Sequence, residues 1–273
     1  MRFLPLLLVI VPLAFFLLAG TRRAARKLRI IQAQLAAYRK ADYEAQLKII
    51  EGLRGSGAEP HDYLFFRGAA CYQLGRLDEA ERALRRGLSL ETNPSLRTVC
   101  RDELGRVLMA QQRWDEAEAC FRECIAEAPQ RSGGHRALAE MLLRRGGDST
   151  ATLEPAQSAV AADRGVTARR SALGKEDNAI NLSESLAILA WALAANQADR
   201  HEIESTLDEA FRLCGVTTKP VLAELHYTAG RAQLALGNAG ESRRQFACAA
   251  EIDPAGTYGR LSQSALPTAD LPA

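Results

Sequence analysis

Residues 104–129 read LGRVLMAQQRWDEAEACFRECIAEAP, and this stretch decides the fold. Its small residues Gly105 and Ala117 stand where two antiparallel helices can approach closely, because a small side chain leaves room between the backbones. Phe121 and the leucines of the first helix are large enough to fill the remaining gap. Pro129 ends the second helix, since proline has no backbone N–H to donate. The stretch therefore predicts two packed helices joined by a short turn.

The same spacing recurs in both directions along the chain. One copy, near the C-terminus, holds Ala229, Gly230, Ser242, Phe246 and Pro254, and another, upstream, holds Gly68, Ala80, Leu84 and Gly87. These units resemble the tetratricopeptide repeat (TPR), a helix-turn-helix of 34 residues. The resemblance implies an all-α fold, a right-handed α-solenoid of antiparallel helix pairs. No stretch alternates apolar and polar residues as a half-buried strand would, which agrees with that class.

We expect five repeats, and a sixth degenerate one, between about residues 26 and 254. The expected parts are a degenerate first helix pair over residues 30–60, a TPR-like array over 61–258 with insertions near 147–155 and 163–181, and a disordered tail over 259–273. The second insertion is either a loop or a helix extension, and its basic residues could contact an acidic partner or a membrane surface. The tail is rich in Ser, Ala, Pro and Leu, which favours disorder.

An apolar run covers residues 3–19 and is followed by the basic residues Arg22, Arg23, Arg26, Lys27 and Arg29. At about 1.5 Å per residue, a helix over this run is roughly 26 Å long, close to the ~30 Å of a bilayer core. We predict a transmembrane signal-anchor over residues 1–20 and a basic juxtamembrane flank over 21–29. Since positive flanks stay in the cytoplasm, the repeats should face the cytoplasm. A cleaved signal peptide is the alternative, which Leu17 or Leu18 before the cleavage site disfavours.

Charge and cysteine usage exclude several functions. The formal net charge of +2 is too small for the footprint of a nucleic-acid-binding protein. Cys71 and Cys124 fall at helix-packing positions, and none of the six cysteines has zinc-ribbon spacing, which favours free thiols in a reducing compartment. No phosphate loop, nucleophile elbow or dinucleotide fingerprint occurs. We therefore expect no enzyme, no cofactor, no metal and no nucleic-acid partner.

The resemblance implies a concave groove, lined by the first helix of each pair, that holds an extended peptide or a partner helix. The protein-binding residues that repeat phase and residue type select are Phe65, Tyr72, Arg106, Met109, Arg136, Glu140, Trp191, Tyr227 and Arg231. Trp191 and Tyr72 have a second interpretation, packing between neighbouring repeats. Replacing Arg106 and Arg136 together by glutamate should weaken partner capture and leave the array folded.

Members of the family that bind chaperone tails use Lys and Asn residues which this chain lacks. At those positions it has Phe65 and Ala69, then Asp102 and Arg106. The sequence thus predicts a membrane-anchored scaffold or adaptor that binds another protein, at the inner membrane of a bacterium. The alternatives are a secreted or periplasmic module released by signal cleavage, and a regulatory subunit of a membrane-associated enzyme or protease.

Overall fold

The computed structural model describes residues 29–30, 32–34, 36–52, 60–169, 175–215 and 217–266, and within these ranges the chain is made of helices and turns without a strand. Residues 29–30, 32–34 and 36–39 are helical. The helices that follow are α2 (Tyr43–Glu51), α3 (Pro60–Gln73), α4 (Leu77–Leu90), α5 (Pro94–Ala110), α6 (Trp114–Glu127), α7 (Ser132–Arg145), the 3₁₀ turn η1 (Ser149–Thr152), α8 (Leu153–Arg169), α9 (Lys175–Ala195), α10 (Arg200–Cys214), α11 (Lys219–Ala235), α12 (Ala239–Ile252) and α13 (Thr257–Ala265). The predicted all-α class is confirmed.

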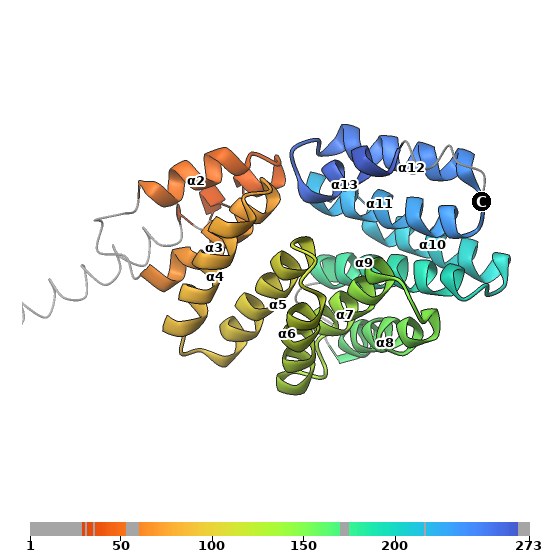
Figure 1. Ribbon diagram of the computed structural model, residues 1–273, viewed down its shortest axis with the longest axis horizontal. Helices are drawn as coiled ribbons and strands as arrows, with labels where there is room; N and C mark the ends of the chain where they lie inside the picture. Colours follow the sequence, from red (N-terminus) through yellow and green to blue (C-terminus); the bar gives the residue numbers. More distant parts are fainter. Residues whose placement is uncertain are drawn as a thin grey trace, which may run out of the picture.

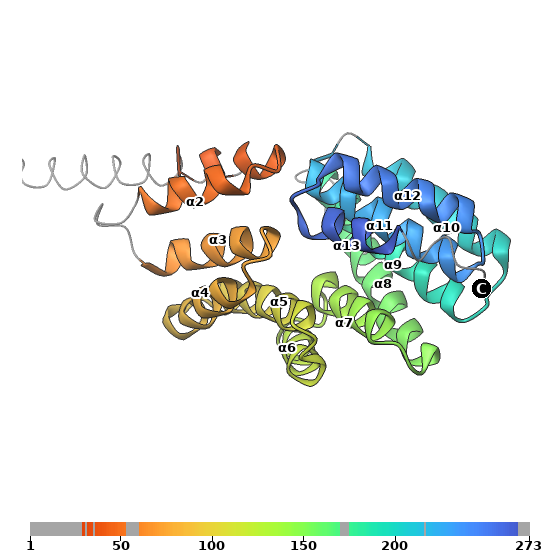
Figure 2. The ribbon, with the colours of Figure 1, turned by 45° about the horizontal axis from the view of Figure 1, so that its top comes forward.

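The helices form antiparallel pairs, α3 with α4 through to α11 with α12, and α2 pairs with the helical residues before it. These are the five predicted repeats and the degenerate sixth. Gln34 and Gln46 hold that first pair together, because each side-chain amide donates to the other residue's backbone carbonyl, at 3.1 and 3.2 Å. The pairs stack into an arc whose two ends approach each other, so that the turn before α13 and the start of α13 lie near one end of α2 and α3 (Figures 1 and 2).

A residue with positive φ marks the turn inside each pair. The six positions are Ala41, Gly75, Gln112, Gly146, Gln197 and Gly237, with φ between 56° and 75°. A left-handed residue after the first helix lets the chain reverse while its N–H satisfies a carbonyl of the last helical turn. The recurrence of this turn defines the six pairs independently of side-chain type.

Close packing inside the pairs explains the small residues of the repeat. A Cβ on Gly105 would lie 2.5 Å from the ring of Phe121, and one on Gly230 would lie 2.7 Å from the ring of Phe246. Both phenylalanines are fully buried. Interiors packed this densely have no space for an added methyl group, so glycine is required at both positions.

The first predicted insertion, 147–155, contains η1 and the start of α8. The Asn196 amide donates to the Ser149 carbonyl at 2.8 Å and ties η1 to the end of α9. The second, 163–181, is a helix extension in its described part, because α8 continues to Arg169 and α9 begins at Lys175. Residues 170–174 lie outside the described ranges.

The predicted disordered tail over 259–273 is wrong for its first part. Residues 257–265 form α13, in which Tyr258 and Ser262 are buried. Asp253 starts a turn in which its carboxylate accepts from the Gly256 N–H at 2.9 Å, and Pro254 prevents α12 from continuing. The turn redirects the chain, so that α13 packs against α11 and α12. Residues 267–273 lie outside the described part.

The predicted membrane segment, residues 3–19, and the basic residues Arg22, Arg23, Arg26 and Lys27 lie outside the described ranges, and Arg29 is exposed. Among the helices that the structure describes, none combines the length and apolar character that a membrane span requires.

Candidate functional site on the concave face

Polar side chains from the first helices of the five pairs after α2, and from α13, gather on the inner, concave side of the arc. We call this group the concave cluster; it consists of Tyr72 (α3), Asp102, Glu103 and Arg106 (α5), Arg136, Glu140 and Arg144 (α7), Glu184 (α9), Glu224 (α11) and Tyr258 (α13). The first helix of each pair lines the concave side of the arc, and its charged residues lie on that side as well. The result is a charged interior in a protein whose helix pairs are packed by apolar residues.

Arg106 is the centre of the concave cluster. Its guanidinium lies 3.4 Å from carboxylate oxygens of both Asp102 and Glu140, and it donates to the Tyr258 hydroxyl at 3.3 Å. Burial disfavours the charged form of Arg106, but the neighbouring carboxylates outweigh burial and raise its pKa well above the usual range. Arg106 is therefore a fixed cation that joins α5, α7 and α13.

Two further arginines complete the ion pairs. Arg136 contacts Glu184 at 2.8 Å, and Arg144 contacts Glu140 at 3.4 Å. For both arginines burial opposes the charge, yet the carboxylates raise the pKa. Each guanidinium of the cluster thus has a carboxylate partner, and the pairs bridge α5, α7 and α9.

Glu103 and Glu224 differ from the other carboxylates because neither side chain has a hydrogen bond or ion pair with a described residue. Burial raises the pKa of Glu103 to about 7, against the opposing effect of Arg106. Burial and the Glu184 carboxylate raise the pKa of Glu224 to about 8. Both side chains are half-buried, so solvent or a ligand can reach them.

Three buried polar atoms of the concave cluster also have no partner among the described residues: the Tyr72 hydroxyl, Oδ1 of Asp102 and Nε of Arg136. A buried polar atom left unpaired costs about 1–3 kcal/mol. Such atoms are places where a water molecule or a ligand atom would be stabilising.

The C-terminal segment 253–260 covers one end of the concave face. The Thr257 N–H donates to the Gln73 side chain at 3.0 Å, and the Arg260 guanidinium donates to the Gln73 carbonyl at the end of α3. The Tyr43 hydroxyl donates to Asp253 at 2.5 Å. The Arg260 cation satisfies a free carbonyl at the C-terminus of α3, which is a favourable position for a positive charge. The three contacts hold the two ends of the array together. We call this contact region the seam.

The structure buries most of the side chains that repeat phase assigned to a binding groove. Tyr72, Met109, Glu140, Trp191 and Tyr227 are at most 3% exposed. The second interpretation of Trp191, packing between repeats, agrees with its edge-on contact with Tyr227 at 6.4 Å, and Arg231 stacks over its ring at 4.6 Å. Tyr72 and Met109 belong to the apolar core as well.

The remaining predicted residues are Phe65, Arg106, Arg136 and Arg231. Phe65, Arg136 and Arg231 are half-buried, and Phe65 packs against Phe66 at 5.3 Å. Arg106 is paired with Asp102 and Glu140 and is almost fully buried, so its replacement by glutamate should destabilise the array as well as change the binding face.

Sequence reasoning missed Glu103, Glu184, Glu224 and Tyr258. The first three lie on first helices, and repeat phase could have placed them on the inner side. Tyr258 could not be found in that way, because it follows the last repeat.

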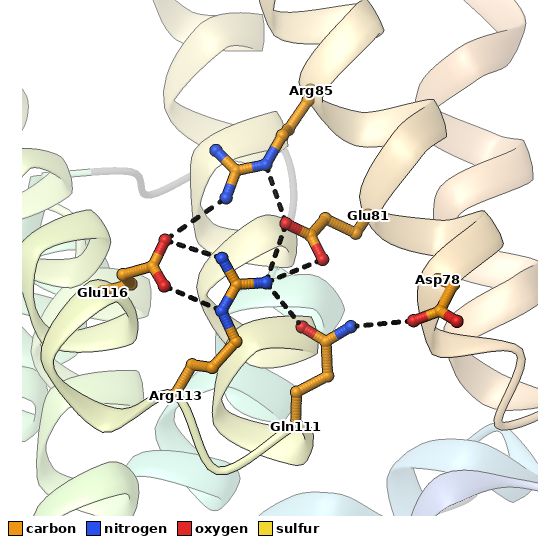
Figure 3. A network of polar contacts seen from close by, with 6 residues as sticks. All are labelled: Asp78, Glu81, Arg85, Gln111, Arg113 and Glu116. Atoms are coloured by element: carbon orange, nitrogen blue, oxygen red, sulfur yellow. Dashed lines mark hydrogen bonds and ion pairs between the residues drawn. The ribbon is translucent and has the colours of Figure 1, made fainter.

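A second polar network lies between neighbouring second helices (Figure 3). Glu81 of α4 accepts two hydrogen bonds from Arg113, at 2.8 and 2.9 Å, and one from Arg85 at 2.8 Å. Burial opposes ionisation of Glu81, but these hydrogen bonds outweigh it and lower its pKa. Its members pair with one another, so this network links α4 to the turn before α6.

The six cysteines are free thiols in the structure, with four buried, Cys120 half-buried and Cys248 exposed. Burial raises the pKa of Cys124 to about 12, so its thiol stays protonated. In the described ranges no three His, Cys, Asp or Glu side chains gather as metal ligands do.

The fold and its concave cluster define a TPR-like helical repeat protein. Residues 61–94 and 100–131, which hold nearly all of α3 to α6, match the family model of the tetratricopeptide repeat. No curated protein matches the chain in sequence.

Solved structures resemble the chain in fold. It is similar to TTC0263, a thermophilic TPR protein of Thermus thermophilus, at 18% identity over 77% of this chain and 98% of that one, with a TM-score of 0.51. It also resembles YrrB, a TPR protein with an unusual peptide-binding site, at 16% identity over 78% and 96%, TM-score 0.39. The quorum sensor NprR from B. thuringiensis, in its apo form, has 12% identity over 91% and 70%, TM-score 0.48.

Proposed function

We propose that this chain is a scaffold that binds another protein on the concave face of its helical array. The observation that carries the proposal is the set of unsatisfied groups there: within the part of the chain that the structure describes, two carboxylates have no partner and three buried polar atoms have no hydrogen bond. Folding alone would favour removal of such groups, because each costs stability. A protein partner that supplies the missing hydrogen bonds and charges would offset this cost in the complex. No catalytic step is part of this proposal.

We also propose that residues 3–19 anchor the scaffold in a membrane and that the repeats face the cytoplasm, at the bacterial inner membrane. The support is the apolar run and the five basic residues after it. Protease treatment of spheroplasts tests the orientation. The repeats should resist digestion until the membrane is opened, and digestion from the outer face would contradict the cytoplasmic orientation.

Release of the repeats by signal cleavage is the alternative to anchoring. N-terminal sequencing of the mature chain separates the two, because a start near Gly20 or Arg22 means release. A regulatory subunit of a membrane-associated enzyme is compatible with the same binding surface, and the identity of the captured partner decides it.

Site-specific photo-crosslinking tests the binding face. A benzophenone amino acid at Phe65, on the first helix α3, keeps the phenylalanine ring and adds a benzoyl group to it, and Phe65 is only half-buried, so the added group has access to the surface. The same amino acid at Arg122, which is 68% exposed on the second helix α6, is the control. The proposal predicts one protein crosslinked from position 65 and absent from position 122. Crosslinking from position 122 alone would contradict it.

A further inference from the structure

We infer that Glu103 and Glu224, with the Tyr72 hydroxyl, form a binding site for the positively charged side chain of a lysine or arginine in the partner protein. This inference rests on the proposed function and gives the partner a chemistry. The bound group would be positively charged, whereas the acidic tails that basic grooves capture are negatively charged. The charge balance, the position and the free hydrogen-bonding capacity of the site all support it.

The charge balance of the concave cluster is negative. Its carboxylates are Asp102, Glu103, Glu140, Glu184 and Glu224, and its guanidinium groups are those of Arg106, Arg136 and Arg144. All three guanidiniums are engaged with Asp102, Glu140 or Glu184. Two carboxylates, Glu103 and Glu224, are therefore left without a cation from the described part of the chain.

Glu103 and Glu224 face a common space, although one is on α5 and the other on α11. The link between the two helices is Tyr258, which accepts a hydrogen bond from Arg106 of α5 at 3.3 Å and packs against Tyr227 of α11, with ring centroids 5.5 Å apart. Glu103 lies three residues before Arg106 and Glu224 lies three residues before Tyr227, so each carboxylate is on the same helix face as the residue that Tyr258 contacts. Both carboxylates also raise the pKa of the Tyr38 phenol, which agrees with this placement. Both are also within range of Arg106, whose own charge is already balanced by Asp102 and Glu140.

The Tyr72 hydroxyl is an independent sign that the site is incomplete. Tyr72 is 3% exposed, yet its hydroxyl has no hydrogen-bond partner among the described residues. Burial raises its pKa, and Arg144, Glu140, Arg106 and Glu103 have smaller effects on it, which agrees with a position beside the concave cluster. A phenol oxygen can accept a hydrogen bond from an ammonium or guanidinium group. The site thus offers a neutral acceptor beside its carboxylates.

The cost of these groups indicates function. Burial makes ionisation of a carboxylate without a cation unfavourable, and the Glu184 carboxylate repels that of Glu224 in addition. Glutamine at either position would keep the size and remove the repulsion. Sites that bind charged ligands characteristically contain groups that reduce the stability of the free protein. A cation from a partner would remove this cost when it binds.

The test uses the full-length chain in a non-ionic detergent and measures binding of tetralysine, acetylated and amidated so that its side chains carry its only charges. The site variant is Glu103→Gln with Glu224→Gln. The control variant is Glu202→Gln with Glu251→Gln, which removes the same charge from two exposed positions on α10 and α12. Calorimetry at low ionic strength gives the affinities, and thermal unfolding gives Tm.

We expect the site variant to bind tetralysine at least about tenfold more weakly than the wild type, since each lost ion pair of about 1.4 kcal/mol is a factor of ten. Its Tm at pH 8 should be higher than that of the wild type. The control should bind and melt like the wild type. Binding should also weaken from pH 8 to pH 6, because protonation of Glu103 and Glu224 removes the charge that attracts the ligand.

Proton binding at these two groups depends on every element around them. Glu103 faces Asp102 and Arg106 of its own helix, Tyr72 of α3 and Tyr38. The groups that face Glu224 are Glu184 of α9, Arg136 and Glu140 of α7, Arg106 of α5, Tyr258 of α13 and Tyr38. The pH dependence is therefore read as the difference between wild type and site variant.

Equal binding by the site and control variants would overturn the inference, because the peptide would then bind the general surface. Absence of tetralysine binding, or binding of tetraglutamate in its place, would also overturn it. If photo-crosslinking at Phe65 still captures a partner in either case, the scaffold function stands and only the basic chemistry of the partner is wrong. A site variant with a lower Tm than the wild type would assign both carboxylates to the fold and contradict a binding role.

Discussion

Tyr258 of α13 donates its hydroxyl to Glu140 of α7 at 3.2 Å, across 118 residues of chain. The same hydroxyl accepts from Arg106 of α5. One phenol thus connects the end of the array to the ion pairs in its middle. The concave face is consequently a closed polar interior at this point, which a linear stack of repeats would leave open.

Removal of the Tyr258 hydroxyl should destabilise the protein. In Tyr258→Phe the ring keeps its packing against Tyr227 at 5.5 Å, but Glu140 and Arg106 lose a buried hydrogen bond. We expect a loss of about 1–3 kcal/mol in the free energy of unfolding, measured by urea denaturation. Ser264→Ala, at an exposed position on the same helix, is the control and should change it by less than about 0.5 kcal/mol. Equal effects would contradict the role of the hydroxyl.

The seam should loosen when Arg260 is replaced by alanine. Its guanidinium donates to the backbone carbonyls of Tyr72 and Gln73, so its loss leaves the end of α3 uncapped. Hydrogen exchange should become faster in residues 253–265 and at the end of α3. Arg244→Ala, which removes a 76% exposed arginine from α12, should leave both regions unchanged. Faster exchange throughout the array would mean a global loss of stability and would contradict a local seam.

Two glycine-to-alanine substitutions should change the stability of the protein in opposite directions. Gly105→Ala puts a methyl group 2.5 Å from the Phe121 ring and should cost about 1–3 kcal/mol. Gly165→Ala, inside α8 with no atom within 4 Å of the new Cβ, should stabilise by about 0.5–1 kcal/mol, because alanine favours helix more than glycine. Thermal unfolding measures both. A stabilising Gly105→Ala would contradict the packing within the repeat.

Stability should fall as pH rises through the neutral range, in part because of Glu103 and Glu224. Their pKa values are about 7 and 8 in the folded chain, above the ordinary value of 4.5. The folded state therefore holds protons that the unfolded state has released, and this contribution is complete below pH 4.5 and lost as pH rises to about 8. Glu103→Gln with Glu224→Gln should reduce the fall in Tm between pH 5 and pH 8.5. An unchanged fall would contradict the raised pKa values.

The sequence predicts the repeat well, because its determinants are local. Gly105 and Phe121 are close in the chain, and their size complementarity alone predicts a helix pair. The same phase also identifies which helices face inward. It does not predict the burial of Arg106, and it does not decide between packing and binding for Trp191, since both depend on how far the whole array curves.

Closure of the arc depends on contacts between distant residues. Tyr43 and Asp253, which meet at the seam, are 210 positions apart. No periodic signal connects them, and α13 lies beyond the last repeat. The turn Asp253-Pro254-Ala255-Gly256 has the composition of a chain reversal, followed by Thr257 and apolar residues, which is the one signal that could have predicted a further helix.

Carboxyl footprinting tests the binding face most directly. The full-length chain is treated with a carbodiimide and an amine, alone and in complex with the partner that crosslinking identifies, and the labelled carboxylates are located by mass spectrometry. Glu103 and Glu224 should be labelled in the free chain and protected in the complex, while Asp115 and Glu123, which are 91% and 64% exposed on α6, should be labelled equally in both. Protection of Asp115 and Glu123 without protection of Glu103 and Glu224 would contradict a concave binding face.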